Sequence, residues 1–391
     1  MTPDAFSPAA LGPCTLKNRI IKAATFEGVT PGGRVTDDLV AFHRRVALGG
    51  AAMSTVAYLA VSPEGRTDRH CILVSDEVLE DLRRLTGEIH AGGALAAAQL
   101  GHAGPVANAR SNGSPSLGPS NGFSPMGTRW RAVTEADIAR ITDDYGRAAA
   151  TLVEAGFDSL EIHLGHGYLL SSFLSPKHNR RRDAWGGSLE NRARFPRQVV
   201  TEVRRAVGNR AAVTAKLNMA DGVPGGFWVD ESVAVGRMLE ADGTLDALAL
   251  TGGSSLANPM YLFRGEAPRA EFAATLPAAL RLGFKAVGRR FLPEYPFEEA
   301  YFLPYARQFR AALDMDLILL GGINRLDTIE AALGEGFGFV AMARALLREP
   351  DLVERMRRGR ATESLCVHCN KCMPTIYRGT RCVLVHDAAG G

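Results

Sequence analysis

The sequence has 391 residues, of which 46% are hydrophobic, enough to bury a large core. Its 45 basic and 42 acidic residues are interspersed and give a formal net charge of only +3, which argues against a nucleic-acid-binding surface. No stretch approaches 18 consecutive apolar residues, and residues 1–10 lack a charged start followed by an apolar segment. We therefore expect neither a signal peptide nor a membrane span, and we expect a cytoplasmic protein.

Short apolar segments alternate with longer amphipathic segments along the chain. The expected strands are residues 19–25, 51–57, 94–100, 157–163, 212–217, 245–251, 317–321 and 338–342. The expected helices include residues 37–48, 135–155, 189–206, 232–241, 298–313 and 327–333, with Thr134 and Asp327 as N-cap residues. Repeated strand–helix units without a break in composition favour a closed (β/α)₈ barrel, the TIM barrel, over a doubly wound sheet. No GxGxxG motif follows the first strand, which weakens a dinucleotide-domain reading.

Two connections are too long to be simple loops. Residues 101–131 follow the third strand, and residues 254–296 follow the sixth and contain the stretch Tyr261-Leu-Phe-Arg264. Long insertions at the carboxyl ends of barrel strands usually build the rim of the pocket. We expect residues 1–349 to form the barrel with these insertions, and residues 350–391 to form a short cysteine-rich C-terminal extension.

The segment 161–195 has the sequence EIHLGHGYLLSSFLSPKHNRRRDAWGGSLENRARF and carries the strongest functional signal. It places His163, His166 and Tyr168 at and just beyond the end of the fourth expected strand. Imidazole and phenol groups donate hydrogen bonds and carry protons, and barrel enzymes keep their active sites at the carboxyl ends of strands. A lone His or Tyr at such a position is usually a packing residue, but the three together indicate an active site.

This segment resembles the Old Yellow Enzyme family of FMN-dependent ene-reductases. The similarity extends to LKNRI at residues 16–20, AVSPEGR at 60–66, AQLGHAG at 98–104, LLGGI at 319–323 and AMARALLREPDLV at 341–353. These motifs occur in the family's order and cover nearly the whole chain. The resemblance implies a TIM-barrel oxidoreductase that binds FMN and accepts electrons from NAD(P)H.

The resemblance also implies which residues hold the flavin. The family's phosphate cradle after strands seven and eight corresponds to Gly321, Gly322, Ala343 and Arg344, although glycines there can also simply end a strand. Gln99 ends the third strand with an amide that suits the pyrimidine edge of the flavin.

Two further positions depart from the family pattern. Lys216 stands where most of the family has Arg, and it would supply positive charge near N1 of the flavin. A barrel lysine can instead form a Schiff base, so a flavin-free lyase stays open. At the end of the first strand, Ala24 and Thr25 are expected to line the flavin. Phe26 occupies the place where relatives often have a Thr or Cys that tunes the flavin potential; either Thr25 substitutes for it or the tuning bond is absent.

In the family, residues matching His163 and His166 bind the activating oxygen of the substrate, and the residue matching Tyr168 donates a proton to the α-carbon. The implied reaction is reduction of the C=C bond of a small activated, α,β-unsaturated alkene by a ping-pong hydride transfer. An alternative is an amine or enone-forming dehydrogenase that passes its electrons to a separate partner protein.

Four cysteines, Cys366, Cys369, Cys372 and Cys382, lie within 17 residues near the end of the sequence. In a reducing compartment this spacing is typical of a tetrahedral metal or a [4Fe–4S] cluster. The motif resembles that of 2,4-dienoyl-CoA reductase and trimethylamine dehydrogenase, with a shorter last gap. A cluster, zinc and free thiols are the three alternatives, and His368 could replace one cysteine. Because the sequence ends at Gly391, we expect any electron-transfer partner to be a separate protein; a homo-oligomer also stays open.

Overall fold

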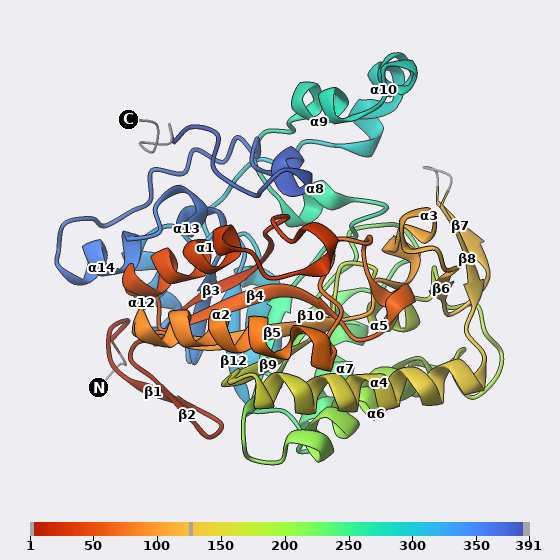
Figure 1. Cartoon of the computed structure of the whole chain (residues 1–391), viewed down its shortest axis with the longest axis horizontal. Helices are drawn as coiled ribbons and strands as arrows, with labels where there is room; N and C mark the ends of the chain where they lie inside the picture. The colour runs from red at the N-terminus through yellow and green to blue at the C-terminus, as the bar shows by residue number, and fades with distance from the viewer. Residues whose placement is uncertain (1–3, 125–127, 386–391) are drawn as a thin grey trace.

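The computed structural model describes residues 4–124 and 128–385. The first three residues of the expected barrel region and the last six of the expected C-terminal extension, 386–391, lie outside the described residues. Its centre is a closed barrel of eight parallel strands (Figure 1). The strands are β3 Ile20–Phe26, β4 Met53–Ala60, β5 Leu95–Gly101, β9 Ser159–Leu164, β10 Ala212–Asn218, β11 Ala247–Thr251, β12 Asp316–Leu320 and β13 Phe339–Met342. Each pairs with the next, and β13 pairs with β3 to close the barrel. The TIM barrel expected from the sequence is confirmed.

Helices surround the barrel and bury the outer faces of its strands. They include α1 Asp37–Leu48, α2 Leu79–Ala91, α4 Glu135–Glu154, α6 Leu189–Val207, α7 Val229–Ala241, α11 Leu303–Arg310, α12 Leu326–Gly334, α13 Arg344–Arg348 and α14 Leu352–Arg357. Because both faces are covered, every residue of β9 and β10 is buried. Polar side chains within these two strands are therefore withdrawn from water and need partners inside the protein.

Two helix starts show how side-chain hydrogen bonds set helix boundaries. Thr134 caps α4 as expected, in a capping box with Asp137. Asp327, by contrast, is not the N-cap of α12: that position belongs to Arg325. The carboxylate of Glu299 accepts hydrogen bonds from the backbone N–H groups of Asn324 (2.6 Å) and Arg325 (3.1 Å), so a side chain distant in sequence performs part of the capping.

Helix α11 is also shorter than the sequence pattern predicts, because it starts at Leu303 and not near residue 298. Pro304 lies in its first turn, where the missing N–H costs nothing. The preceding residues Tyr301 and Phe302 are buried against the barrel instead.

The two long connections, after β5 and after β11, contain short helices and strands of their own, and a short helix also follows β9. After β5 come α3 Ala109–Asn112 and a small sheet of β6 Ser116–Gly118, β7 Gly122–Phe123 and β8 Arg129–Ala132. After β9 comes the short helix α5 Leu169–Leu174, and after β11 come α8 Pro259–Leu262, α9 Arg269–Thr275 and α10 Ala278–Phe291. Figure 1 shows α9 and α10 projecting at one end of the molecule, and the C-terminal extension running beside α8.

The hairpin of β1 Ala9–Leu11 and β2 Cys14–Leu16 lies at the opposite end of the barrel. The Cys14 thiol donates to the carbonyl of Asp158, just before β9, and a side chain at Gly12 would collide with Asp246, just before β11. The hairpin thus covers the amino ends of the strands and leaves their carboxyl ends for a site.

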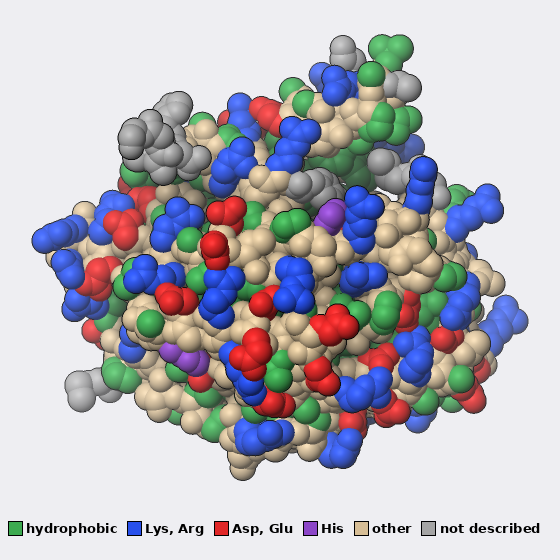
Figure 2. All heavy atoms as spheres, in the orientation of Figure 1, with side chains coloured by type: hydrophobic (Ala, Val, Ile, Leu, Met, Phe, Trp, Pro, Cys, Tyr) green, Lys and Arg blue, Asp and Glu red, His purple; other side chains and the backbone are tan. Residues whose placement is uncertain are grey.

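Figure 2 shows basic and acidic side chains mixed over the visible face, as their similar numbers predict. In the part of the chain that the structure describes, none of the helices has the length and apolarity needed to cross a membrane.

Candidate functional site

Glu161 joins two of the expected flavin-binding residues at the centre of the site. Its Oε1 atom accepts a hydrogen bond from Nε2 of Gln99 (2.7 Å) and lies 2.8 Å from Nζ of Lys216. The three residues belong to the adjacent strands β5, β9 and β10, and the side chains of Lys216 and Glu161 are 4% and 11% exposed. A buried ion pair with a third hydrogen bond fixes the positions of all three groups.

The sequence analysis did not single out Glu161. The available signal was strand register: Glu161 pairs with Gln99 on one neighbouring strand and with Thr214, two residues before Lys216, on the other. Residues of neighbouring strands at such positions share one face of the sheet.

His163, His166 and Tyr168 are brought together as the sequence predicts. The ring centres of His163 and Tyr168 are 4.6 Å apart, and those of His163 and His166 are 4.8 Å apart, both in edge-to-face geometry. Tyr58, at the end of β4, packs its ring against Tyr168 at 5.4 Å. The Nδ1 atom of His163 is buried and has no hydrogen-bond partner among the described residues, so it is available to a ligand.

His166 is held by two residues that the sequence analysis did not single out. Its Nε2 atom lies 2.9 Å from the hydroxyl of Thr251, and its backbone N–H donates to Oδ1 of Asn218 at 3.0 Å. The backbone of His166 has a φ of 61°, an uncommon left-handed conformation for a residue other than glycine. Asn218 and Thr251 are paired in register as the last residues of β10 and β11, so the strand ends impose this conformation.

Burial keeps both imidazoles neutral. It lowers the pKa of His166 to about 3, with a further contribution from the positive Lys216. Burial also lowers the pKa of His163 well below its ordinary value, aided by His166 and Lys216. At neutral pH these two histidines are therefore neutral hydrogen-bonding groups.

The expected phosphate cradle lies at the ends of β12 and β13. Gly321 and Gly322 have φ values of 105° and 79°, a backbone that side chains rarely adopt. A Cβ on Gly321 would lie 2.4 Å from the Phe302 ring, and one on Gly322 would lie 2.6 Å from the Tyr301 ring. Only glycine fits at these two positions.

Ala343 and Arg344 open the helix after β13. The Arg344 side chain points toward the cysteine extension: it donates to the carbonyl of Arg264 at 2.8 Å and bonds to Oδ1 of Asn370. Its guanidinium is therefore already engaged by the protein.

At the end of the first barrel strand, Ala24, Thr25 and Phe26 are partly exposed toward the mouth. The Thr25 hydroxyl lies 2.9 Å from the buried carboxylate of Glu27, to which it donates. Lys22 also contacts Glu27, at 2.7 Å. The proton of Thr25 is thus committed to Glu27 and is not free for a flavin oxygen.

These residues fit FMN. A glycine cradle, an inward amide at Gln99, a cation at Lys216 and an unsatisfied His163 nitrogen lie around the same barrel mouth. FMN needs an anchor for its phosphate, partners for its pyrimidine edge and positive charge near N1, and each has a candidate here.

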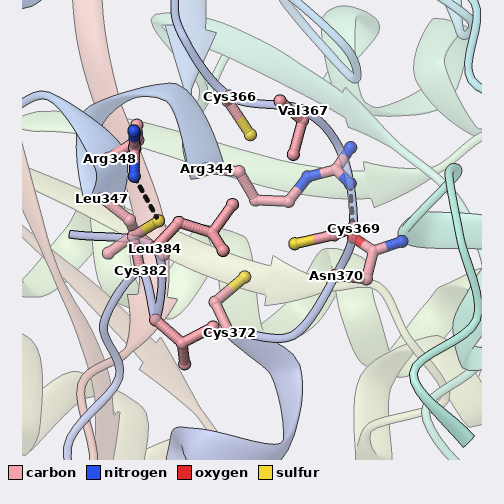
Figure 3. A pocket seen from close by; sticks show the side chains of 11 residues that line it. Arg344, Leu347, Arg348, Cys366, Val367, Cys369, Asn370, Cys372, Cys382 and Leu384 are labelled. Carbon is pink, nitrogen blue, oxygen red and sulfur yellow. Dashed lines mark hydrogen bonds between the residues drawn. The ribbon is translucent and has the colours of Figure 1, made fainter. Parts of the chain in front are cut away.

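The four cysteines of the extension line one small cavity together with Arg344 and Arg348 (Figure 3). Arg348 contacts the sulfur of Cys382 at 3.8 Å. Burial raises the pKa of the Cys366 thiol, and it raises that of Cys372 to about 11, so both favour the protonated form.

The expected metal or [4Fe–4S] site at these cysteines is not supported. Among the described residues, no group of three or more His, Cys, Asp or Glu side chains is placed to hold a metal ion. His368, the alternative ligand, instead stacks on Phe297 with ring centres 3.3 Å apart.

The chain was compared with known proteins. The model of the NADH:flavin oxidoreductase / NADH oxidase family matches residues 4–249. A 4,4'-dithiodibutanoate disulfide reductase from Rhodococcus erythropolis is 59% identical over 99% of this chain and 96% of its own length. A metal reductase from Desulforamulus reducens is 32% identical over 95% of this chain, which spans only 52% of that protein.

Among solved structures, a complex of 2-naphthoyl-CoA reductase with 2-naphthoyl-CoA superimposes with a TM-score of 0.83 at 25% identity, covering 98% of this chain and 57% of that one. Both the family match and the relatives agree with the motifs, the barrel and the geometry of its mouth. The chain therefore belongs to the NADH:flavin oxidoreductase / NADH oxidase family, the family of the Old Yellow Enzymes, and is an enzyme that uses FMN and NADH.

Proposed function

We propose that this enzyme reduces the C=C bond of a small activated alkene with electrons from NAD(P)H. The observation that carries the proposal is the buried Nδ1 atom of His163, which lacks a protein partner and lies in a cluster with His166 and Tyr168. A substrate oxygen that accepted a hydrogen bond in this cluster would have its carbonyl polarised. Bound FMN would supply the hydride chemistry between the nicotinamide and the substrate.

The protein's own groups divide the remaining work. His163 and His166, both neutral, orient the activating oxygen and stabilise the negative charge that develops on it. Tyr168 gives its proton to the α-carbon, so the alkene gains one hydride and one proton. Glu161 positions Gln99 and Lys216 for the flavin, and Lys216 places positive charge at the flavin ring.

The alternative lyase reaction finds less support. A Schiff base requires a neutral lysine amine, whereas Lys216 is buried in an ion pair 2.8 Å from Glu161. The Glu161 carboxylate engages this nitrogen, so Lys216 is not presented for attack on a carbonyl.

A second candidate function is reduction of a small organic disulfide, favoured by the 59% identity with the Rhodococcus disulfide reductase. The same pocket can serve it with balanced chemistry. A hydride delivered to one sulfur breaks the S–S bond, and the other sulfur leaves as a thiolate that takes a proton from Tyr168. Both candidates consume one hydride and one proton.

One experiment separates the two candidates. The enzyme is reduced anaerobically with one equivalent of NADH and then mixed with 2-cyclohexen-1-one or with 4,4'-dithiodibutanoate, while flavin absorbance and products are followed. Faster flavin reoxidation by the enone, with cyclohexanone as product, supports the first proposal. Reoxidation by the disulfide alone assigns the second function, and failure with both rejects both.

A further inference from the structure

Asp221 lies just beyond the end of β10 and has no part in the reaction described above. The residue is only 3% exposed. Its Oδ2 atom accepts hydrogen bonds from the Ser175 hydroxyl (2.7 Å) and the backbone N–H of Phe227 (2.9 Å). Its Oδ1 atom accepts one from Nδ2 of Asn218 (2.9 Å). A carboxylate suits these three neutral donors because both of its oxygens accept, whereas an amide would turn a donor of its own toward one of them.

Asn218, the last residue of β10, links Asp221 to the proposed site. It is fully buried. Its Nδ2 group donates to Asp221 and to the carbonyl of Gly253 at 2.8 Å, and its Oδ1 atom accepts the backbone N–H of His166 at 3.0 Å. The donor and acceptor ends of an amide point in different directions. The carboxylate and the carbonyl, which both need a donor, therefore decide that the oxygen of Asn218 faces His166.

The backbone of His166 needs this acceptor because its conformation is unfavourable by itself. Its φ of 61° lies in the left-handed region, which a residue other than glycine keeps only where the surroundings determine it. Hydrogen bonds hold the residue on both sides: its N–H donates to Asn218, and its carbonyl accepts the N–H of Ser255 at 3.0 Å. In this conformation the imidazole Nε2 lies 2.9 Å from the Thr251 hydroxyl.

From these contacts we propose that Asp221 is a positioning residue for His166 and acts by fixing the amide orientation of Asn218. The carboxylate attracts the Nδ2 group, so the Oδ1 atom faces the His166 N–H and holds the left-handed turn. That turn carries the imidazole into the cluster with His163 and Tyr168. The inference rests on the proposed function for what His166 does, but not for the hydrogen bonds that position it.

Asp221→Asn keeps the shape of the side chain and removes its charge. The new amide keeps its oxygen toward the two donors of Ser175 and Phe227, which turns its NH₂ group toward Nδ2 of Asn218. Two donors then face each other, so Asn218 turns over and the His166 N–H loses its acceptor. Adding Asn218→Asp supplies one oxygen for the new amide and one for the His166 N–H. A neighbouring carbonyl loses its donor, so this recovery is partial.

Hydrogen exchange of the His166 backbone N–H reports its bond to Asn218 without turnover. Two-dimensional ¹H–¹⁵N spectra of the FMN-bound enzyme, labelled with ¹⁵N-histidine, detect this group, and His166→Gln identifies its signal. We expect exchange to be at least tenfold faster in Asp221→Asn and to slow at least threefold again in the double variant. Stopped-flow reoxidation of the reduced enzyme by 2-cyclohexen-1-one should slow about tenfold and recover in the same order, while reduction by NADH stays within twofold of wild type.

Asp246→Asn is the matched control. Asp246 lies just before β11, at the opposite end of the barrel, and its Oδ2 atom also accepts a backbone N–H, from Val213 at 2.7 Å. It should leave both measurements within twofold of wild type. Unchanged exchange in Asp221→Asn, or no recovery in the double variant, would overturn the proposal. If Asp221→Asn does not fold, Asn218→Ala decides, because it removes the acceptor directly and must speed the exchange. A wild type that does not reduce the enone would refute the proposed function and leave the exchange result standing.

Discussion

Two regions of this molecule come from equally compact sequence motifs but differ in what the fold makes of them. The residues at the barrel mouth, from Glu161 to Tyr168, are held by neighbouring strands and form direct contacts with one another. The four cysteines of the extension line a common cavity but form no metal-binding group among the described residues. Strand register fixes side chains relative to each other, whereas irregular backbone does not, so contacts among the protein's own side chains hold only the first group together.

Removal of the Tyr168 hydroxyl should have the largest effect at the barrel mouth, because it tests the proposed proton donor. Tyr168→Phe should slow reoxidation of the reduced enzyme by an enone by about 10²- to 10⁴-fold, the usual contribution of general acid catalysis, while reduction by NADH is unchanged. Stopped-flow absorbance measures the two half-reactions separately. Tyr145→Phe, which alters a buried tyrosine of α4, is the control and should affect neither. Equal slowing of both half-reactions would remove Tyr168 from the proton-donor role.

Replacement of Glu161 tests whether the mouth is held by its buried ion pair. Glu161→Gln removes the charge that Lys216 faces, and breaking such a pair typically costs about 3 kcal/mol in the free energy of unfolding. The exposed pair of Glu335 with Arg307 has a similar length, 2.7 Å, and Glu335→Gln should cost less than about 1 kcal/mol. Urea denaturation of both variants measures the difference; similar values would show that burial does not strengthen the Glu161 pair.

Alkylation of Cys372 probes the extension. Burial raises the pKa of this thiol to about 11, so the thiolate is scarce at pH 8 and its share rises tenfold per pH unit until the pKa is reached. The alkylation rate by iodoacetamide, followed by mass spectrometry of the Cys372 peptide, should rise in the same proportion between pH 8 and 10. Complete protection, with iron or zinc in the purified protein, would show that the four cysteines bind a metal and would remove the contrast between the two regions.

Thr251→Val tests whether Thr251 positions His166 at the barrel mouth, and it has the smallest expected effect on the reaction rate. It removes the hydroxyl next to Nε2 of His166, worth about 1 kcal/mol, so substrate reduction should slow about fivefold with unchanged flavin content. Thr142→Val, which deletes a hydroxyl bonded to the Ile138 carbonyl within α4, is the control. If both variants retain wild-type turnover, Thr251 does not position His166 for the reaction.

Much of this protein could be predicted from its sequence. The strands and helices of the barrel follow from short apolar segments that alternate with longer amphipathic segments. The grouping of His163, His166 and Tyr168 follows from their short spacing at one strand end. Such features depend on residues close in sequence, whose relative positions are set by local backbone geometry. The family followed from the order of several specific motifs.

Only the tertiary structure decided the contacts between residues distant in sequence. Three sets of contacts join such segments. Glu161 bonds to Gln99 and Lys216, Glu299 accepts bonds at the start of α12, and Arg264 packs among the rings of Tyr261 and Tyr301. The cysteine motif shows the converse: its four side chains line one cavity, but among the described residues they form no group placed to hold a metal ion. Sequence fixes which groups are available, and packing across the barrel determines which of them meet.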